Sequence, residues 1–215
     1  MISVKKFVFN PFQVNAFVLF DETGDCILID PAVSSERELT QLETFIEENK
    51  LHPTLLVNTH SHIDHLLGNH TIAQGYGIKL AAHPAGQVFI DKAHASAERF
   101  GLHLEGTKNI DIFLDDQQEL SFGNAKLKIL YTPGHADGSI CLYAEKEAFV
   151  ISGDVLFNQS IGRTDLPTGD YDVLQKSIWE KLFTLADETL VYPGHGPETT
   201  IGSEKVNNPF VAIGM

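Results

Sequence analysis

Seven residues with metal-binding side chains are concentrated in four short segments of this chain. The segment from His60 to His65 holds three imidazoles and one carboxylate within six positions. Both groups bind zinc, iron and manganese. Seven ligands are too many for one ion and suit two. We therefore predict a site for two divalent ions, zinc first and iron or manganese as alternatives, with the ligands His60, His62, Asp64, His65, His135, Asp154 and His195.

The spacing within the first segment divides its side chains between the two ions. His60 and His62 lie two positions apart, so their side chains point the same way in an extended segment. Asp64 and His65 follow where a helix is expected to begin, and they can face a second ion. Because neighbouring side chains diverge in such a segment, a single ion cannot easily bind all four.

The three later candidates must complete the two sites. His135 and His195 supply one imidazole each, and the spacing leaves open which ion each of them binds. Asp154 can bridge both ions, because a carboxylate has two oxygens. A glycine directly precedes each of these three residues, and glycine allows backbone angles and close approaches that other residues do not.

Composition and charge limit the kinds of protein that this chain can be. The 215 residues are 43% hydrophobic, which fits one domain spanning residues 1–215. The formal net charge of −14 argues against a nucleic-acid partner, which would need clustered Lys and Arg. We therefore expect a small-molecule substrate as the partner. The sequence does not predict an oligomeric state.

The sequence also bears on the compartment. Asn10, Pro11 and Gln13 interrupt any signal-peptide core, and no apolar run approaches the length that spans a membrane. We therefore expect a cytoplasmic protein with no membrane partner. The two cysteines, Cys26 and Cys141, lie in apolar runs, which favours buried free thiols over a disulfide.

Hydrophobic patterning predicts the elements that carry the candidate ligands. Short apolar runs between turn residues predict strands at 4–9, 16–20, 26–30, 55–57, 78–82, 120–122, 126–132, 139–144, 147–152 and 190–192. Helical spacing and capping residues predict helices at 35–49, 65–74, 84–100 and from 170 onwards. Short strands that end in glycine turns indicate an α/β (α+β) fold, with two sheets and outer helices.

These motifs, in this order, resemble those of the metallo-β-lactamase superfamily of metal-dependent hydrolases. The match consists of His-x-His-x-Asp-His at 60–65, Thr-Pro-Gly-His at 132–135, Gly-Asp at 153–154 and Pro-Gly-His at 193–195. The resemblance implies an αββα sandwich of two mixed sheets with the metals at one edge. It also implies that one ion is bound by His60, His62 and His135, the other by Asp64, His65 and His195, and both by Asp154.

Within the superfamily, the chain is similar to the short, single-domain enzymes of the glyoxalase II-like branch. The segments 132–139, 153–157, 160–165 and 193–197 carry this similarity. Glyoxalase II hydrolyses the thioester of hydroxyacylglutathione, and its family offers glutathione a basic residue and a tyrosine after the Gly-Asp motif. Arg163 matches the basic residue as a substrate contact. Asp165 stands where the tyrosine would be, and a carboxylate disfavours an anionic tripeptide.

The resemblance and the ligand chemistry predict hydrolysis of a small thioester or a related ester. A dinuclear site lowers the pKa of a bound water, and the hydroxide attacks the carbonyl carbon. A thiol leaving group has a pKa of about 8.5 and departs without a strong general acid. Asp64 and Asp154 are the expected catalytic residues, Asp64 as a proton carrier and Asp154 as the bridge. Asp30 and Thr59 are expected just outside the ligands, with Asp30 orienting a histidine.

Another reaction class competes with hydrolysis. Non-haem iron dioxygenases that oxidise glutathione persulfide share this fold and a segment like 162–165, and they bind one iron through two histidines and one aspartate. They usually carry an aspartate soon after the last motif, where this chain has Gly196 and Pro197, which favours the hydrolase. A zinc β-lactamase is disfavoured, because such enzymes typically have a cysteine in place of Asp154 and are exported.

Overall fold

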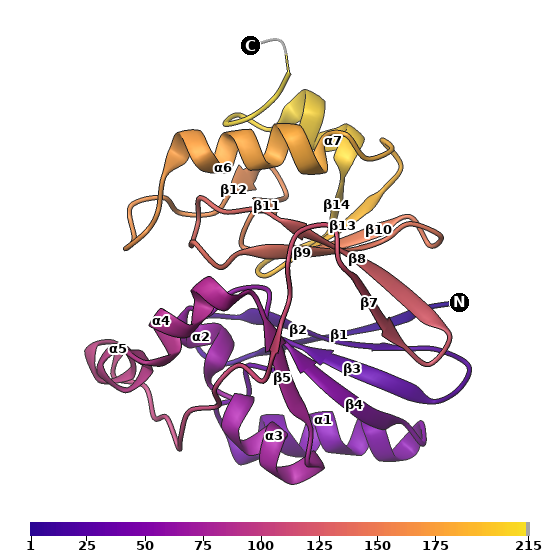
Figure 1. The fold of residues 1–215 in the computed structure, drawn as a ribbon, viewed down its shortest axis with the longest axis vertical. Helices are drawn as coiled ribbons and strands as arrows, with labels where there is room; N and C mark the ends of the chain where they lie inside the picture. Colours follow the sequence, from indigo (N-terminus) through magenta and orange to yellow (C-terminus); the bar gives the residue numbers. More distant parts are fainter. Residues whose placement is uncertain (214–215) are drawn as a thin grey trace.

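Two six-stranded sheets pack face to face, with helices on their outer sides (Figure 1). The computed structural model describes residues 1–213. The first sheet has the order β1 (Ser3–Phe9), β2 (Val14–Phe20), β3 (Asp25–Ile29), β4 (His52–Val57), β5 (Lys79–Ala82), β6 (Ile112–Phe113). The second has the order β14 (Thr199–Thr200), β13 (Leu190–Pro193), β10 (Phe149–Gly153), β9 (Ile140–Ala144), β8 (Ala125–Tyr131), β7 (Glu119–Phe122). This arrangement confirms the predicted αββα sandwich.

Both sheets are mixed, and their parallel strands fix where the candidate ligands emerge. In the first sheet, β3, β4 and β5 run parallel, with Ile29 beside Val57 and Val57 beside Ala81. In the second sheet, β10 and β13 run parallel, with Gly153 beside Pro193. Strands that are parallel and in register end together, so the residues that follow them meet at one edge of each sheet.

Helices cover the outer faces of the two sheets. The first sheet carries α1 (Glu36–Glu48), α2 (Ile63–Leu66), α3 (Asn69–Tyr76), α4 (Gln87–Ile90) and α5 (Ala93–Phe100), with a 3₁₀ turn at Pro84–Gly86. The second sheet carries α6 (Tyr171–Ser177), a π-helical turn at Ile178–Leu182 and α7 (Ile201–Asn207). A short hairpin of β11 (Leu156–Phe157) and β12 (Ser160–Ile161) follows the second sheet's central strands.

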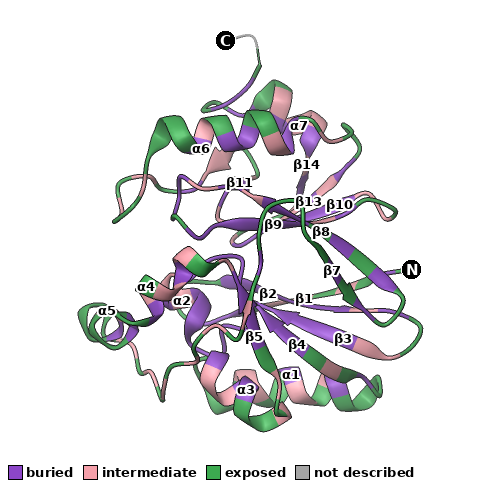
Figure 2. Ribbon diagram, viewed as in Figure 1, coloured by how far each residue is buried: buried purple, intermediate pink, exposed green. Residues whose placement is uncertain are grey.

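Three apolar layers hold these elements together, and Figure 2 shows the buried positions concentrated on the strands. The layer between the sheets includes Ile29, Val57 and Ile151. A second layer packs the first sheet against its helices, and a third packs the second sheet against α6. A sheet that is covered on both faces needs strands that are apolar throughout, and β2 is buried at six of its seven positions.

Two of the predicted helices differ from the observed elements. The predicted helix 65–74 is divided at Gly68, where a Cβ would lie 2.9 Å from the Val33 backbone nitrogen. Its second part runs past Gly75 and ends at Gly77, whose left-handed φ of 66° caps the helix. The predicted helix 84–100 is divided into a 3₁₀ turn, α4 and α5. Ile90 of α4 and Ala93 and Ala97 of α5 are buried in the apolar layer beside the first sheet.

Candidate metal centre

All seven predicted ligands lie at the common edge where the parallel strands end. The segment after β4 carries the first four of them, and α2 begins within it. Asp154 directly follows β10, and the turn after β13 carries His195. The turn after β8 carries His135. The structure therefore brings together side chains that are up to 135 positions apart, from His60 to His195.

The candidate ligands form two groups of three. In the first, the ligand atoms of His60, His62 and His135 all lie within 4.8 Å of one another. In the second, those of Asp64, His65 and His195 lie within the same distance of one another. The grouping matches the one that the family resemblance implies, and it answers the question that spacing left open for His135 and His195.

Asp154 lies between the two groups. Its Oδ1 is 3.5 Å from His65 Nε2, and its Oδ2 is 3.6 Å from His135 Nε2 and 3.5 Å from His195 Nε2. Two nitrogen or oxygen ligands of one tetrahedral zinc ion, each at about 2.0–2.1 Å, lie about 3.3 Å apart. The separations around Asp154 are close to this value, so one carboxylate can reach both ions.

Buried polar atoms without partners support a metal in this place. His60 Nε2, His65 Nε2 and Asp154 Oδ1 are buried and have no hydrogen-bond partner among the described residues. A buried polar atom without a partner is costly and rare in a folded protein. Because all three atoms are potential metal ligands, the donor set fits divalent ions well.

Main-chain carbonyls orient two of the imidazoles. His135 Nδ1 donates to the Arg163 carbonyl at 2.8 Å, and His195 Nδ1 donates to the Phe12 carbonyl at 3.0 Å. Since the carbonyl oxygen only accepts, each Nδ1 carries the proton in the neutral ring. The Nε2 lone pair then points toward the other candidate ligands, as in many histidine metal sites, and His135 Nε2 lies 2.9 Å from His62 Nδ1.

Asp30 and Thr59 orient two further imidazoles. Asp30 Oδ2 accepts from His65 Nδ1 at 3.0 Å and from the Thr59 hydroxyl at 2.6 Å. Asp30 Oδ1 accepts from the Thr59 amide at 2.9 Å and from Asn58 Nδ2 at 3.1 Å. Because its two oxygens already accept four hydrogen bonds, Asp30 suits an orienting role better than a ligand role, although it lies beside His60 and His65. The Thr59 oxygen also lies 3.2 Å from His60 Nδ1.

The turn after β1 and the first residues of β2 hold the second group of ligands in place, and the sequence did not predict this support. Asn10 Nδ2 donates to the carbonyl of Asp64 at 2.9 Å, and the backbone of Asn10 has a left-handed φ of 55°. Asn15 Nδ2 donates to the carbonyls of Pro193 and Gly196 at 2.9 Å each, on either side of His195. The only available signal was a pair of asparagines around Pro11, a pattern that indicates no more than a turn.

Two glycines allow this close packing. Gly153 has a φ of 51°, and a Cβ there would lie 2.5 Å from Thr59 Oγ1. A Cβ on Gly194 would overlap Asp154 Oδ1. Larger residues at these two positions would therefore push the bridging carboxylate or its neighbours out of place.

Arg163, the predicted substrate contact, is paired with a neighbouring carboxylate. Its Nε and Nη2 donate to Asp165 at 2.9 and 2.8 Å, and both side chains are largely exposed. The pairing raises the pKa of the Arg163 guanidinium. Its main chain lies at the site through the bond to His135, while its charge is neutralised by Asp165.

Electrostatics favour neutral imidazoles in the first group and ionised carboxylates at Asp64 and Asp154. Burial lowers the pKa of His60, and it lowers the pKa of His62 to about 4. Burial by itself would raise the pKa of Asp154, but the nearby imidazoles of His65 and His195 outweigh it and hold that pKa far below its usual value. Neutral imidazole and ionised carboxylate are the forms that bind metal.

In the metal-free protein, the pKa of His65 is shifted upward, in the opposite direction to those of His60 and His62. Burial would lower the pKa of its imidazole, but the carboxylates of Asp64, Asp154 and Asp30 outweigh burial and raise it well above its usual value. The hydrogen bond to Asp64 and the charge of Asp154 likewise raise the pKa of His195 against the effect of burial. These two imidazoles must therefore lose protons when a metal binds.

Two other predictions concern the rest of the chain. Cys26 and Cys141 are free and buried, as predicted, and burial raises the pKa of each thiol to about 12. Across residues 1–213, no helix has the length and apolar character needed to cross a membrane.

An αββα sandwich with a His/Asp cluster at the common edge of its parallel strands is the architecture of a metal-dependent hydrolase fold. Residues 9–195 match the family described as the metallo-beta-lactamase superfamily. This chain belongs to that superfamily.

Three relatives illustrate the similarity. The hydroxyacylglutathione hydrolase GloC of Haemophilus influenzae is 36% identical over 207 residues, which cover 93% of each chain. The solved structure of the BLEG-1 B3 metallo-beta-lactamase is 35% identical, with a TM-score of 0.88, and covers 98% of this chain and 99% of its own. TTHA1623, solved in a di-iron-bound form, is 33% identical, with a TM-score of 0.85. The match covers 96% of this chain and 100% of the TTHA1623 chain.

Proposed function

We propose that this protein is a dinuclear metal-dependent hydrolase that cleaves a small thioester or a related ester. The observation that carries the proposal is the position of Asp154, whose oxygens lie 3.5–3.6 Å from histidine nitrogens of both groups. A single carboxylate so placed suits two ions better than one. The name of the GloC relative, a hydroxyacylglutathione hydrolase, supports the thioester as the substrate class.

The residues of the chain have separate roles in this proposal. His60, His62 and His135 would bind one ion, the second group would bind the other, and Asp154 would bind both. When bound, two adjacent dications supply a hydroxide at neutral pH and polarise the carbonyl of the substrate. Asp64, whose Oδ2 lies 3.5 Å from His195 Nε2, is placed to move a proton at the second ion.

The leaving group decides between a thioester and a simple ester. A thiolate departs readily because the pKa of its thiol is about 8.5, so a thioester needs less protonation of its leaving group than an alkyl ester. Carboxylates with lowered pKa values, such as Asp64 and Asp154, are poor general acids at neutral pH. The site therefore suits a thioester best.

Zinc is the metal that we propose, with iron or manganese as alternatives. Imidazole and carboxylate ligands accept all three, and the di-iron form of the TTHA1623 relative favours iron as the first alternative. Elemental analysis of the purified protein would count and identify the metals. A screen of thioesters, esters and lactones would then test the reaction. One tightly bound iron, with oxygen uptake on a persulfide and no hydrolysis, would instead support the dioxygenase.

A second candidate function is β-lactam hydrolysis. The BLEG-1 relative, named as a B3 metallo-beta-lactamase, shares 35% of its residues with this chain at a TM-score of 0.88. Its name, at this level of similarity, is the reason to test β-lactam hydrolysis. A chromogenic cephalosporin belongs in the same screen. If the protein hydrolyses the cephalosporin efficiently and hydrolyses no thioester, the second proposal would replace the first.

A further inference from the structure

Two phenylalanine rings pack directly against candidate ligands, one in each group. Phe89 of α4 meets His62 edge-on, with ring centroids 5.2 Å apart and planes at 85°. Phe157 of β11 meets His195 edge-on, at 6.3 Å and 78°. Both phenylalanines are only half-buried. Apolar surface therefore adjoins the candidate metal centre on the side of each ion.

A second pair of rings is connected to His195 through the main chain of Phe12. The carbonyl of Phe12 accepts the hydrogen bond from His195 Nδ1, so the residue is fixed at the site by its main chain. Its ring packs edge-on against Phe100, which ends α5, with centroids 6.0 Å apart. We call Phe12, Phe89, Phe100 and Phe157 the aromatic rim.

Exposure distinguishes the aromatic rim from the core. Phe9 and Phe17, in the flanking strands, are 1% and 2% exposed, whereas Phe12 and Phe100 are 40% and 51% exposed. Aromatic rings that stay in contact with water beside a reactive centre are typical of a ligand-binding surface.

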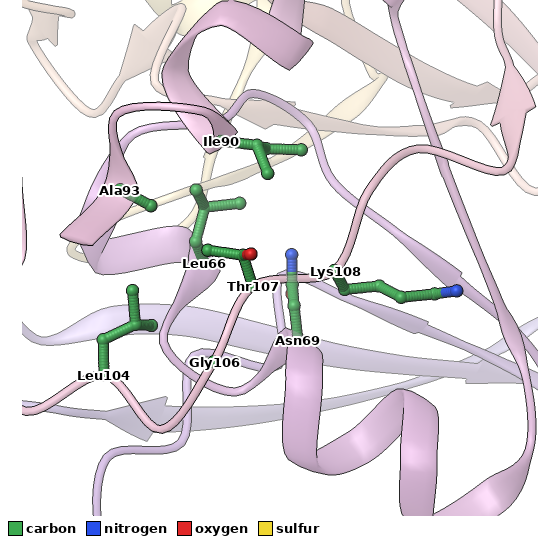
Figure 3. Close-up of a pocket in the computed structure, with 8 residues that line it drawn as sticks. All are labelled: Leu66, Asn69, Ile90, Ala93, Leu104, Gly106, Thr107 and Lys108. Atoms are coloured by element: carbon green, nitrogen blue, oxygen red, sulfur yellow. The ribbon is translucent and has the colours of Figure 1, made fainter.

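The charged side chains near the site also favour an apolar substrate group over an anionic one. The Arg163 guanidinium is paired with both oxygens of Asp165, so an anionic substrate group would have to compete with that carboxylate. The cavity in Figure 3, between α2, α5 and the loop through Leu104 and Lys108, has a volume of about 10 Å³. It holds at most one water and cannot receive the substrate.

We propose that the aromatic rim binds an uncharged, apolar group attached to the reacting carbonyl. The substrate class is then an acyl thioester or ester with an apolar acyl group, in place of one recognised through the carboxylates of glutathione. This inference rests on the proposed hydrolase function, and it adds the part of the substrate that does not react.

Alkyl hydroxamates test the aromatic rim without any turnover, because the hydroxamate head group chelates metal ions and the alkyl group follows its carbonyl. We would measure their dissociation constants by calorimetry, from acetohydroxamate to octanohydroxamate, on protein of known metal content. Burial is worth about 0.8 kcal/mol per methylene, so affinity should rise by up to about fourfold for each methylene added. An analogue of octanohydroxamate that ends in a carboxylate should lose this gain.

Variants identify the rings that are responsible. The double variant Phe12→Ala, Phe100→Ala removes both exposed rings and leaves the carbonyl that anchors His195, so the gain per methylene should fall to less than twofold. Phe210→Ala is the matched control, because Phe210 is 47% exposed and lies beside α6, where Tyr171 donates to its carbonyl. The control should keep the full gain. Thermal melting would check that the variants are folded.

The outcomes separate this inference from the proposed function. The inference would be overturned if hydroxamate affinity does not rise with chain length in the wild type, or if it rises equally in the double variant. This holds even if thioesters are hydrolysed. A clear gain that the double variant abolishes supports the aromatic rim. The same result in a protein that hydrolyses no thioester or ester would keep the apolar site and reject the reaction.

Discussion

At the scale of single residues, this site is defined by which atom of each side chain remains free. His65, His135 and His195 each direct Nδ1 to an oxygen of the protein, which leaves Nε2 for a metal. Asp154 has no such anchor on Oδ1. The functional identity of a residue therefore depends on its partners as well as on its type.

Substitution of the bridging carboxylate tests the ligand assignment. Asp154→Asn keeps the shape of the side chain but replaces one oxygen with an NH₂ donor. The variant should therefore lose metal, and its turnover should fall by about 100-fold or more. Even partners outside the ligands change metal affinity or activity by about 10–100-fold. Metal content and hydrolysis would be measured together. Asp165→Asn, which changes an exposed carboxylate outside the ligand set, should keep the metal. Full metal content and full activity in Asp154→Asn would refute the assignment.

The protonation of His65 and His195 predicts how metal binding depends on pH. Their pKa values are raised in the metal-free protein, so the imidazoles hold protons that the bound metal must displace. Metal affinity should therefore increase as the pH rises above 6.5 and should fall as the pH is lowered. Calorimetry of zinc binding in buffers of different ionisation enthalpy would count the released protons. Binding without proton release would contradict the shifts.

At the scale of elements, the turn after β1 and the start of β2 hydrogen-bond to the segments that carry the second group of ligands. They make no such bonds to the first group among the hydrogen bonds of the described residues. Asn10 bonds to the Asp64 carbonyl, and Phe12 and Asn15 bond to the turn around His195. The first group is instead anchored through Thr59 and the Arg163 carbonyl. The two proposed ions are therefore supported by different parts of the chain.

Removal of the Asn10 side chain should weaken the binding of the second ion more than that of the first. Asn10→Gly keeps the left-handed backbone conformation but removes the hydrogen bonds to Asp64 and Ala32, so the affinity of the second ion should fall by about tenfold. Gln13→Gly is the control, because Gln13 has a similar φ of 58° in the same turn and an exposed side chain. Metal titration followed by elemental analysis measures both ions. Equal loss in the two variants would show that the turn acts only through its backbone.

At the scale of the whole molecule, the proposed ions connect the two halves of the sandwich. His60 and His62 follow a strand of the first sheet, whereas His135 and Asp154 follow strands of the second. Metal bound at this edge links the sheets in addition to the apolar layer between them.

Removal of metal should therefore destabilise the fold. A ligand that binds only the folded state stabilises it by about 2.7 kcal/mol when its concentration is 100 times its Kd. A chelator should lower the melting temperature by several degrees, and added zinc should restore it. Asp154→Asn should melt close to the chelated wild type and respond little to the chelator. An unchanged melting temperature in the chelated wild type would show that the metals do not join the sheets.

The sequence by itself predicted the candidate ligands, most of the strands and the type of fold. Three histidines and an aspartate in six positions, and glycine before each later ligand, are local patterns, and local patterns follow from side-chain type and backbone geometry. Spacing left open which ion His135 and His195 join, the family resemblance implied different ions, and the tertiary structure places the two residues in different groups. It also revealed the anchoring of His195 by Phe12 and the aromatic rim. The physical reason is that such contacts join segments as much as 183 positions apart, which no local periodicity encodes.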